Sequence, residues 1–230
     1  MEFSEDYQKM LDLHEQAHKE GAVRNLNGED IETEGRKIFE GSELLPMLPT
    51  IKEIKDDLNL TSLLDYGCGK ANAYYLAFEL DGVIHPNAYQ YLGIAPAAVH
   101  LYDPCVEQFR SKPRQEQTYD IVVCTDVLEH IPEQDVDTVI EEMVYHANKL
   151  MVFKIAAHES FTKFKGGTNV HATVKPPSWW FDKIIRIATE SGRTILLHIE
   201  VEERESGSDG KRSHISRHIV NQGNKNGNTG

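Results

Sequence analysis

The sequence from residue 62 to residue 71 reads Ser62-Leu63-Leu64-Asp65-Tyr66-Gly67-Cys68-Gly69-Lys70-Ala71. Its apolar run ends in an acid and two glycines one residue apart, a pattern typical of a buried strand that leads into a tight turn. Glycine accepts positive φ and lets the backbone approach a ligand closely. A helix that begins after the turn offers unpaired N–H donors at its first residues. We therefore predict a strand, turn and helix that bind a nucleotide-like ligand.

The composition favours one globular domain. The chain has 230 residues, of which 40% are hydrophobic and 27% are charged, so it is long enough to bury one sizeable core. Its formal net charge of −13 argues against a broad nucleic-acid-binding face, because such faces are normally basic. The three cysteines have no Cys-x-x-Cys spacing and predict reduced thiols in a cytoplasmic protein. The acidic start and the lack of a long apolar run predict no signal peptide and no membrane association.

Two later apolar runs also end in polar residues. Residues 99–102 precede Asp103, and residues 121–124 precede Thr125, Asp126 and Val127. Ligands of open α/β sheets gather at the carboxyl ends of the strands, where we expect these residues to meet the glycine turn. The acid that binds ribose hydroxyls usually follows the glycines by about 20 residues, and Asp103 lies further along the chain. We choose Asp103 because the competing run, residues 89–94, ends in an alanine, which accepts no such hydrogen bond.

These motifs resemble those of the class I S-adenosylmethionine-dependent methyltransferases. The resemblance rests on Asp65-Tyr66-Gly67-Cys68-Gly69 and on Tyr119-Asp120-Ile121-Val122-Val123 with Val127-Leu128-Glu129-His130-Ile131. It implies an α/β fold with a doubly wound, seven-stranded Rossmann-like sheet, mostly parallel, with a C-terminal antiparallel hairpin. It also implies S-adenosyl-L-methionine as the cofactor. The residues expected to bind it are Asp65, Gly67, Cys68, Gly69, Asp103, Thr125, Asp126 and Val127.

The chain is expected to fall into three parts. Residues 1–60 form an N-terminal helical extension that, in similar methyltransferases, lies over the cofactor cleft, with a loop at residues 20–31. Residues 61–220 form the methyltransferase domain. Its helices are expected at residues 71–80, from residue 132 and at residues 178–188, and its last strands at residues 194–201 and 213–220. The Asn- and Gly-rich residues 221–230 are expected to be a disordered tail.

The long irregular segment at residues 157–177 is the expected acceptor-binding loop, because loops of this length are usually functional. His171 in this loop and His130 after the preceding strand are the candidate catalytic bases, because an ordinary histidine accepts a proton near neutral pH. His171, Asn169 and Trp179 are the candidate substrate-binding residues, with core packing as the alternative for Trp179. The histidines show no His-Glu-x-x-His or similar spacing, so the sequence implies no metal.

The leading hypothesis is a methyltransferase that acts on a small polar molecule, with a sugar or another hydroxyl-bearing compound as one possibility. We expect a monomer or homodimer whose partner is this small-molecule substrate, with no nucleic acid. An NAD-dependent oxidoreductase is the first alternative, but Asn72 stands where its Gly-x-Gly-x-x-Gly motif would place the third glycine. The second alternative is a non-catalytic cofactor-binding or interaction module.

Overall fold

The chain has a mixed α/β fold, in which helices pack on a central sheet of mainly parallel strands. The computed structural model describes residues 3–26, 28–204 and the backbone of residues 212–220. Neighbours in the sheet follow the order β11-β10-β8-β7-β3-β6. The parallel strands are β3 (Leu63–Tyr66), β6 (Val99–Tyr102), β7 (Tyr119–Thr125), β8 (Ala147–Ala156) and β10 (Leu196–Arg204).

The expectation of seven strands in this sheet is wrong, since the described residues place six strands in it. The sixth, β11 (Arg212–Val220), pairs antiparallel with β10. Residues 205–211, which join the two strands, lie outside the described residues, so the C-terminal hairpin stays a prediction. The expected disordered tail, residues 221–230, lies outside them as well.

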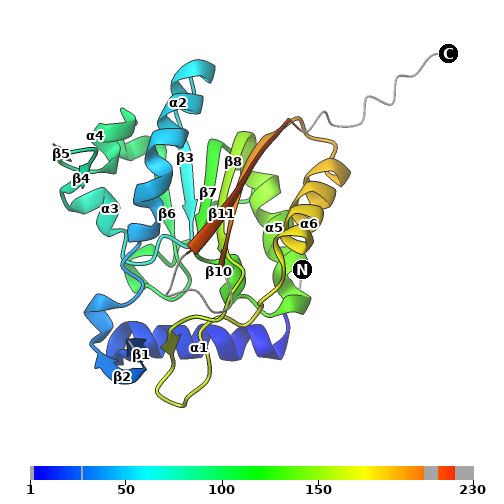
Figure 1. Cartoon of the computed structure of the whole chain (residues 1–230). Helices are drawn as coiled ribbons and strands as arrows, with labels where there is room; N and C mark the ends of the chain where they lie inside the picture. Colours follow the sequence, from blue (N-terminus) through cyan, green and yellow to red (C-terminus); the bar gives the residue numbers. More distant parts are fainter. Residues whose placement is uncertain (1–2, 27, 205–211, 221–230) are drawn as a thin grey trace.

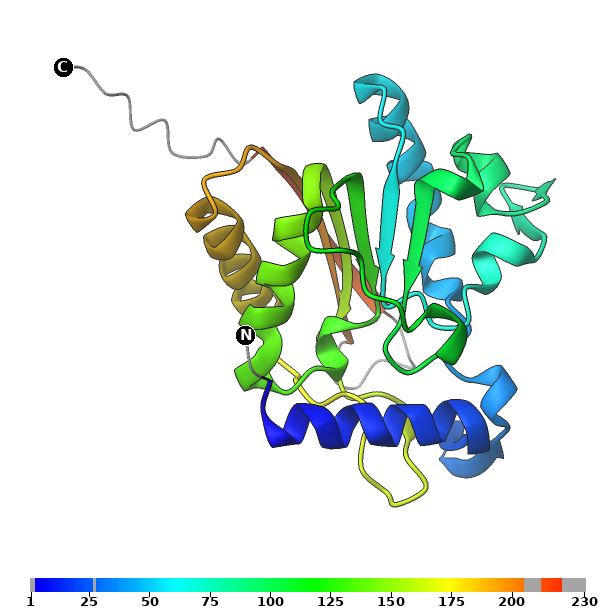
Figure 2. The same cartoon turned by 180° about the vertical axis from the view of Figure 1, so that it is seen from behind.

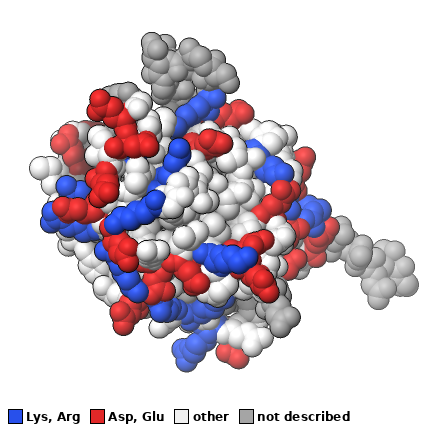
Figure 3. Space-filling view, turned by 90° about the horizontal axis from the view of Figure 1, so that it is seen from below, with Lys and Arg blue, Asp and Glu red and all other residues white. Residues whose placement is uncertain are grey.

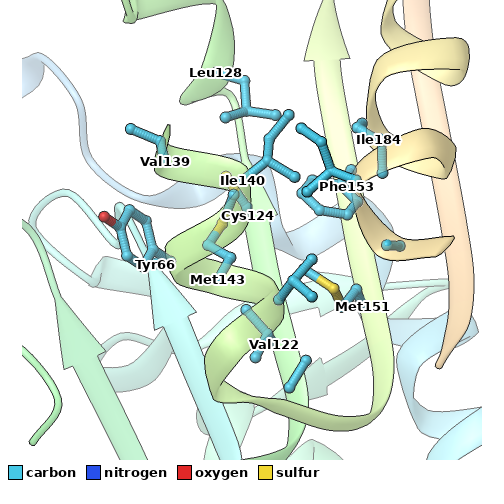
Figure 4. Close-up of a cluster of buried hydrophobic side chains, with 14 of the residues drawn as sticks. Tyr66, Val122, Cys124, Leu128, Val139, Ile140, Met143, Met151, Phe153 and Ile184 are labelled. Atoms are coloured by element: carbon cyan, nitrogen blue, oxygen red, sulfur yellow. The ribbon is translucent and has the colours of Figure 1, made fainter. Parts of the chain in front are cut away.

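The central strands are mainly apolar, as expected when both faces of a sheet are covered. Successive residues alternate between two hydrophobic clusters. Val122 and Cys124 of β7 belong to one cluster, whereas Ile121 and Val123 belong to the other. Figure 4 shows the first cluster, in which Phe153 of β8 and Ile184 meet.

Helices lie on both faces of the sheet (Figures 1 and 2). Helices α5 (Val136–His146) and α6 (Pro177–Glu190) cover one face and supply the first cluster. Helices α2 (Leu48–Leu58), α3 (Asn72–Tyr75) and α4 (Ala88–Leu92) cover the other. The short 3-10 helices are η1 (Gly35–Lys37), η2 (Ser42–Met47), η3 (Pro96–Ala98), η4 (Glu107–Phe109), η5 (Leu128–His130) and η6 (Glu133–Asp135).

Helix α1 (Glu5–Glu20) runs across the carboxyl ends of the parallel strands (Figure 2). Its first turn is capped by the Ser4 hydroxyl, which accepts a hydrogen bond from the Tyr7 amide at 3.1 Å. The Ser4 amide in turn donates to Asp135 Oδ1 at 2.9 Å, which ties the start of α1 to the segment before α5. The N-terminal segment is thereby attached to the main sheet.

The loop expected at residues 20–31 is instead a hairpin of β1 (Ala22–Leu26) and β2 (Glu29–Thr33). Strand β1 also pairs with β9 (Thr162–Lys163), which comes from the long segment after β8. The residues of β2 are mostly exposed, so they carry none of the apolar alternation that predicts a half-buried strand. The long-range pairing with β9 was therefore invisible in the local sequence.

The helix expected at residues 71–80 is also much shorter than predicted. It ends at Tyr75, and β4 (Phe78–Leu80) and β5 (Val83–His85) follow as a second hairpin. Asp81 and Gly82 connect these strands with φ values of 51° and 77°, the left-handed conformation that tight hairpin turns require. The competing strand at residues 89–94 is helix α4 for most of its length.

Among the described residues, no helix combines the length and apolar character needed to cross a bilayer. On the face shown in Figure 3, basic and acidic side chains are interspersed.

Candidate functional site

A cavity of about 300 Å³ lies at the carboxyl ends of β3, β6, β7 and β8. Tyr66, Asp103, Thr125 and Lys154 line it from the ends of these strands. Helix α1 and residues 37–43 line it from the opposite side, and the segment after β8 closes a third side. The cavity therefore occupies the edge where ligands of open α/β sheets bind.

Both glycines of the turn adopt positive φ, and neighbouring groups leave no room for a side chain at either position. Gly67 has a φ of 85°, and a Cβ atom there would lie 2.3 Å from Cγ2 of Val127. Gly69 has a φ of 55°, and a Cβ atom there would lie 2.4 Å from the carbonyl oxygen of Phe39. The turn is therefore packed between the end of β7 and the N-terminal segment.

The unpaired N–H donors were expected at the start of the helix, but the Asn72 amide there donates to the Glu40 carbonyl, and the amides of the turn before it are paired as well. The Gly67 amide donates to the Tyr102 carbonyl at 2.7 Å, and the Gly69 amide donates to Asp103 Oδ2 at 2.9 Å. The Lys70 amide donates to the Phe39 carbonyl at 3.0 Å. A ligand at this turn would meet a shaped backbone surface whose N–H groups already have partners.

Asp103 is held firmly at the end of β6, beside the glycine turn. Strand β6 pairs directly with β3, so the choice of residues 99–102 as the neighbouring strand is confirmed. In addition to Gly69, the Cys105 amide donates to the carboxylate, at 2.8 Å from Oδ1. Burial raises the pKa of Asp103, and the backbone N–H donors partly offset that rise. The carboxylate is fixed at the cavity wall and keeps lone pairs for a further donor.

Asp65 and Cys68, two of the residues expected to bind the cofactor, are not among those that line the cavity. Asp65 is buried beneath the turn, and burial raises its pKa to about 7. The Cys68 thiol is also buried, and burial raises its pKa well above the ordinary range. Neither residue is placed to touch a ligand in the cavity, whereas the other six expected residues line it: Gly67, Gly69, Asp103, Thr125, Asp126 and Val127.

The end of β7 turns sharply at Asp126, whose φ is 59°. Its amide donates to the Lys154 carbonyl at 2.8 Å, which ties the turn to the end of β8. Glu129, one turn further on, is fully buried and accepts a hydrogen bond from the Ala156 amide at 2.6 Å. Burial, and then the charge of nearby Asp126, raise the pKa of Glu129. Two carboxyl groups thus lie close together at this edge of the cavity.

The two candidate catalytic histidines, His130 and His171, meet although 40 residues separate them in the chain. Their ring centroids are 4.9 Å apart, and both residues line the cavity. Nδ1 of His130 lies 3.0 Å from the Val170 carbonyl oxygen, and Nδ1 of His171 lies 2.6 Å from that of His158.

Burial changes the proton chemistry expected of these histidines. It lowers the pKa of His130 to about 4, and burial together with the neighbouring His130 lowers the pKa of His171 to about 4. A general base works best when its pKa is near the working pH. At neutral pH these rings are uncharged and hold protons weakly, so they fit proton uptake less well than the ordinary histidine pKa predicts.

The other two candidate substrate-binding residues lie outside the cavity lining. Asn169 stabilises the loop, because its Oδ1 accepts hydrogen bonds from the Ser160 and His171 amides and its Nδ2 donates to the Ser160 carbonyl. Trp179 packs on α6, where the ammonium group of Lys183 lies 4.5 Å from its ring centroid. Asn169 thus positions His171, and Trp179 contributes to packing on the outer side of the fold.

Several cavity residues were not singled out from the sequence. His14 of α1 belongs to the apolar stripe of its helix, which indicates core packing, yet its ring lies 4.9 Å from that of His130. Lys154 at the end of β8 pairs with Glu43 of η2. Burial acts to lower the pKa of Lys154, but the Glu43 carboxylate outweighs it and the pKa is raised. The one sequence signal for this pair is Lys154 itself, a lysine that interrupts an apolar run near the carboxyl end of its strand.

Comparison of the chain with protein-family models, with curated proteins and with solved structures gave no match.

Proposed function

We propose that this protein is an S-adenosylmethionine-dependent methyltransferase that acts on a small polar acceptor, at oxygen in the first instance. One observation carries the proposal. The glycine turn, Asp103 and the Thr125-Asp126-Val127 segment come from three different strands and line the same cavity. This is the convergence that the resemblance to class I methyltransferases leads one to expect.

The residues present suit S-adenosyl-L-methionine. Asp103 offers carboxylate oxygens to the ribose hydroxyls, and its position is fixed by the Gly69 and Cys105 amides. Leu11, Pro104 and Ile131 supply apolar cavity walls for the adenine ring. The cavity volume of about 300 Å³ lies at the lower end of the range of small-molecule sites, about 300 to 1,000 Å³. The turn would contribute shape, because its N–H groups are already bonded.

When bound, the cofactor supplies an electrophilic methyl group, so the protein has to position the acceptor and exclude water. His130 and His171 would orient an acceptor hydroxyl through the lone pairs of their uncharged rings. The Lys154 ammonium group would add a hydrogen-bond donor on the same side of the cavity. Helix α1 would shield the reacting groups from water, because Tyr7, Met10 and His14 line the side of the cavity that faces the carboxyl ends of the strands.

Binding of S-adenosylhomocysteine, measured by isothermal titration calorimetry beside NADH, tests this function. We expect micromolar binding of S-adenosylhomocysteine alone. The variant Leu11→Trp should weaken it at least about tenfold, because Leu11 lines the cavity and a larger side chain there would reduce the space for a ligand. Leu58→Trp, at a half-exposed position of α2, is the matched control and should bind as the wild type does.

Binding of NADH alone would instead favour the oxidoreductase. Binding of neither compound would leave the interaction module as the better hypothesis. If Leu11→Trp and Leu58→Trp bind S-adenosylhomocysteine equally well, the ligand does not occupy this cavity and the assignment of the site is wrong. Methyl transfer to sugars, nucleosides and small acids is worth screening only if the wild type binds S-adenosylhomocysteine and Leu11→Trp weakens that binding.

A further inference from the structure

We propose that Asp126, His130 and His171 form a binding site for a divalent first-row transition-metal ion of the Zn²⁺ type. The candidate ligand atoms, one from each residue, all lie within 4.8 Å of one another. Asp126 and His130 follow β7, whereas His171 comes from the loop after β9, and all three line the cavity. The long separation between His130 and His171 explains why no metal-binding spacing is visible in the sequence.

The hydrogen bonds of the two imidazoles leave the correct nitrogen available for a metal. A carbonyl oxygen only accepts hydrogen bonds, so Nδ1 of His130 donates to Val170 and Nδ1 of His171 donates to His158. In an uncharged ring the other nitrogen, Nε2, then carries the lone pair. A backbone carbonyl on the second nitrogen is the arrangement that orients most metal-binding histidines.

His130 supplies the decisive observation. The residue is 8% exposed, and its Nε2 atom is buried with no hydrogen-bond partner among the described residues. A buried polar atom without a partner is costly, and native structures rarely leave one without a reason. A metal ion between this nitrogen, His171 and Asp126 would satisfy it.

The surroundings also favour a cation at this place. Glu129 is buried beside Asp126, and its Oε2 atom has no partner in the described part of the chain. Nε2 of His14, whose ring faces His130, is likewise buried and unpartnered within those residues. The Lys154 ammonium group interacts electrostatically with Asp126, but it is already paired with the Glu43 carboxylate. Its positive charge is therefore partly neutralised by Glu43.

Modest side-chain movement would bring the ligands to bonding distance. Ligand atoms about 2.1 Å from a tetrahedral Zn²⁺ lie about 3.4 Å apart, somewhat closer than the 4.8 Å limit found here. Both histidines are buried, whereas Asp126 is partly exposed, so the Asp126 carboxylate is the group with most freedom to turn toward the metal. Two imidazoles and one carboxylate favour Zn²⁺, Fe²⁺ or Co²⁺ over Mg²⁺ and Ca²⁺, which prefer oxygen ligands.

Three protein ligands leave at least one coordination position open toward the cavity. If the proposed methyltransferase function holds, an acceptor hydroxyl would bind the metal there, in place of direct hydrogen bonds to the two imidazoles, and the metal would lower its pKa. The metal site itself does not depend on that function.

The test is a titration of chelator-treated wild-type protein with Co²⁺, followed by visible d–d absorption. We expect a single bound Co²⁺ that Zn²⁺ displaces and that excess Mg²⁺ does not displace. Asp126→Asn should weaken Co²⁺ binding by about 100-fold or more, since losing a ligand costs at least as much as losing a group that orients one. Asparagine tolerates the positive φ of this position, so this variant should fold.

The matched control is His146→Gln. His146 is also buried, and its Nδ1 lies 2.6 Å from the Gln117 carbonyl oxygen, but it lies at the far end of α5. The control should bind Co²⁺ as the wild type does, whereas His130→Gln should not. Absence of a Co²⁺ signal in the wild type would overturn the proposal, as would equal affinity in Asp126→Asn and the wild type. S-adenosylhomocysteine affinity, measured separately without metal, tells a failed metal site from a failed methyltransferase assignment.

Discussion

Asp65 makes the stability of this protein depend on pH in a direction opposite to that of most acidic residues. The carboxyl group is 3% exposed, and its Oδ1 atom has no hydrogen-bond partner among the described residues. Burial is the main reason that its pKa rises from 3.8 to about 7; contact with the Tyr74 hydroxyl lowers it in part, and the charge of Asp103 raises it again. Cys68, Cys124 and Tyr89 also lie near this carboxyl group, and burial raises the pKa of each of them, so these groups stay protonated at neutral pH.

The sign and size of the effect follow from these values. Between pH 4 and pH 7 the folded chain binds the Asp65 proton and the unfolded chain does not, so stability falls as the pH rises through this window. A difference of about three pKa units corresponds to about 4 kcal/mol at pH 8. Asp65→Asn, which carries no charge, should remove most of this loss. We expect the variant to be more stable than the wild type at pH 8 and close to it at pH 4.5.

Urea unfolding of both proteins at these two pH values checks the prediction, because other titrating groups cancel in the difference. Asp120→Asn is the control. Burial acts to raise the pKa of Asp120, but hydrogen bonds from Thr61 and Ser62 outweigh it and the pKa is lowered, so this variant should lose stability at pH 8. Equal free-energy differences between Asp65→Asn and the wild type at both pH values would refute the reasoning.

Two further predictions concern the turn and the loop. Gly67→Ala should lower the free energy of unfolding by about 2 to 4 kcal/mol, because the position has positive φ and the new Cβ would meet Val127; urea unfolding measures this, and the double variant with Val127→Ala should recover part of the loss, so a lack of recovery would contradict the contact. Asn169→Ala should cost about 1 to 3 kcal/mol by removing its three loop hydrogen bonds. It should also speed amide hydrogen exchange at Ser160 and His171, and unchanged exchange at both would show that the side chain does not hold the loop.

The parallel strands could be predicted because the physics that forms them is local. A strand buried on both faces is mainly apolar, and the runs that became β3, β7 and β8 stand out for that reason. Asp103 was identified by its chemistry, since the alternative run ended in an alanine. The polar hairpin of β1 and β2 was missed, because it depends on long-range pairing with β9. The helix after the glycine turn was predicted too long, because the hairpin of β4 and β5 replaces its second half.

The sequence pointed to cavity residues mainly where they come directly after a strand. Asp103, Asp126 and Val127, at the ends of β6 and β7, line the cavity, and their role in binding a cofactor stays a prediction. The sequence did not reveal that Asp65 is buried out of reach of the cavity, since one residue along a strand reverses the face to which a side chain belongs. The meeting of His130 with His171 and His14 depends on tertiary packing across three separate segments, which no local spacing encodes.

The two sides of the cavity differ in how they are attached to the sheet. Asp103 is fixed by two backbone amides at the end of a strand, and neither amide belongs to α1 or to the long loop. His171 is held by Asn169 and by a loop whose two-residue strand β9 pairs with β1, next to α1 and His14. A sequence change in β1 or β9 would therefore act first on the His171 side of the cavity, whereas the amides that hold Asp103 belong to the glycine turn and to the segment after β6. Under the proposed function, acceptor specificity would depend on these segments, and the part of the cavity proposed for the cofactor would depend on the strand ends.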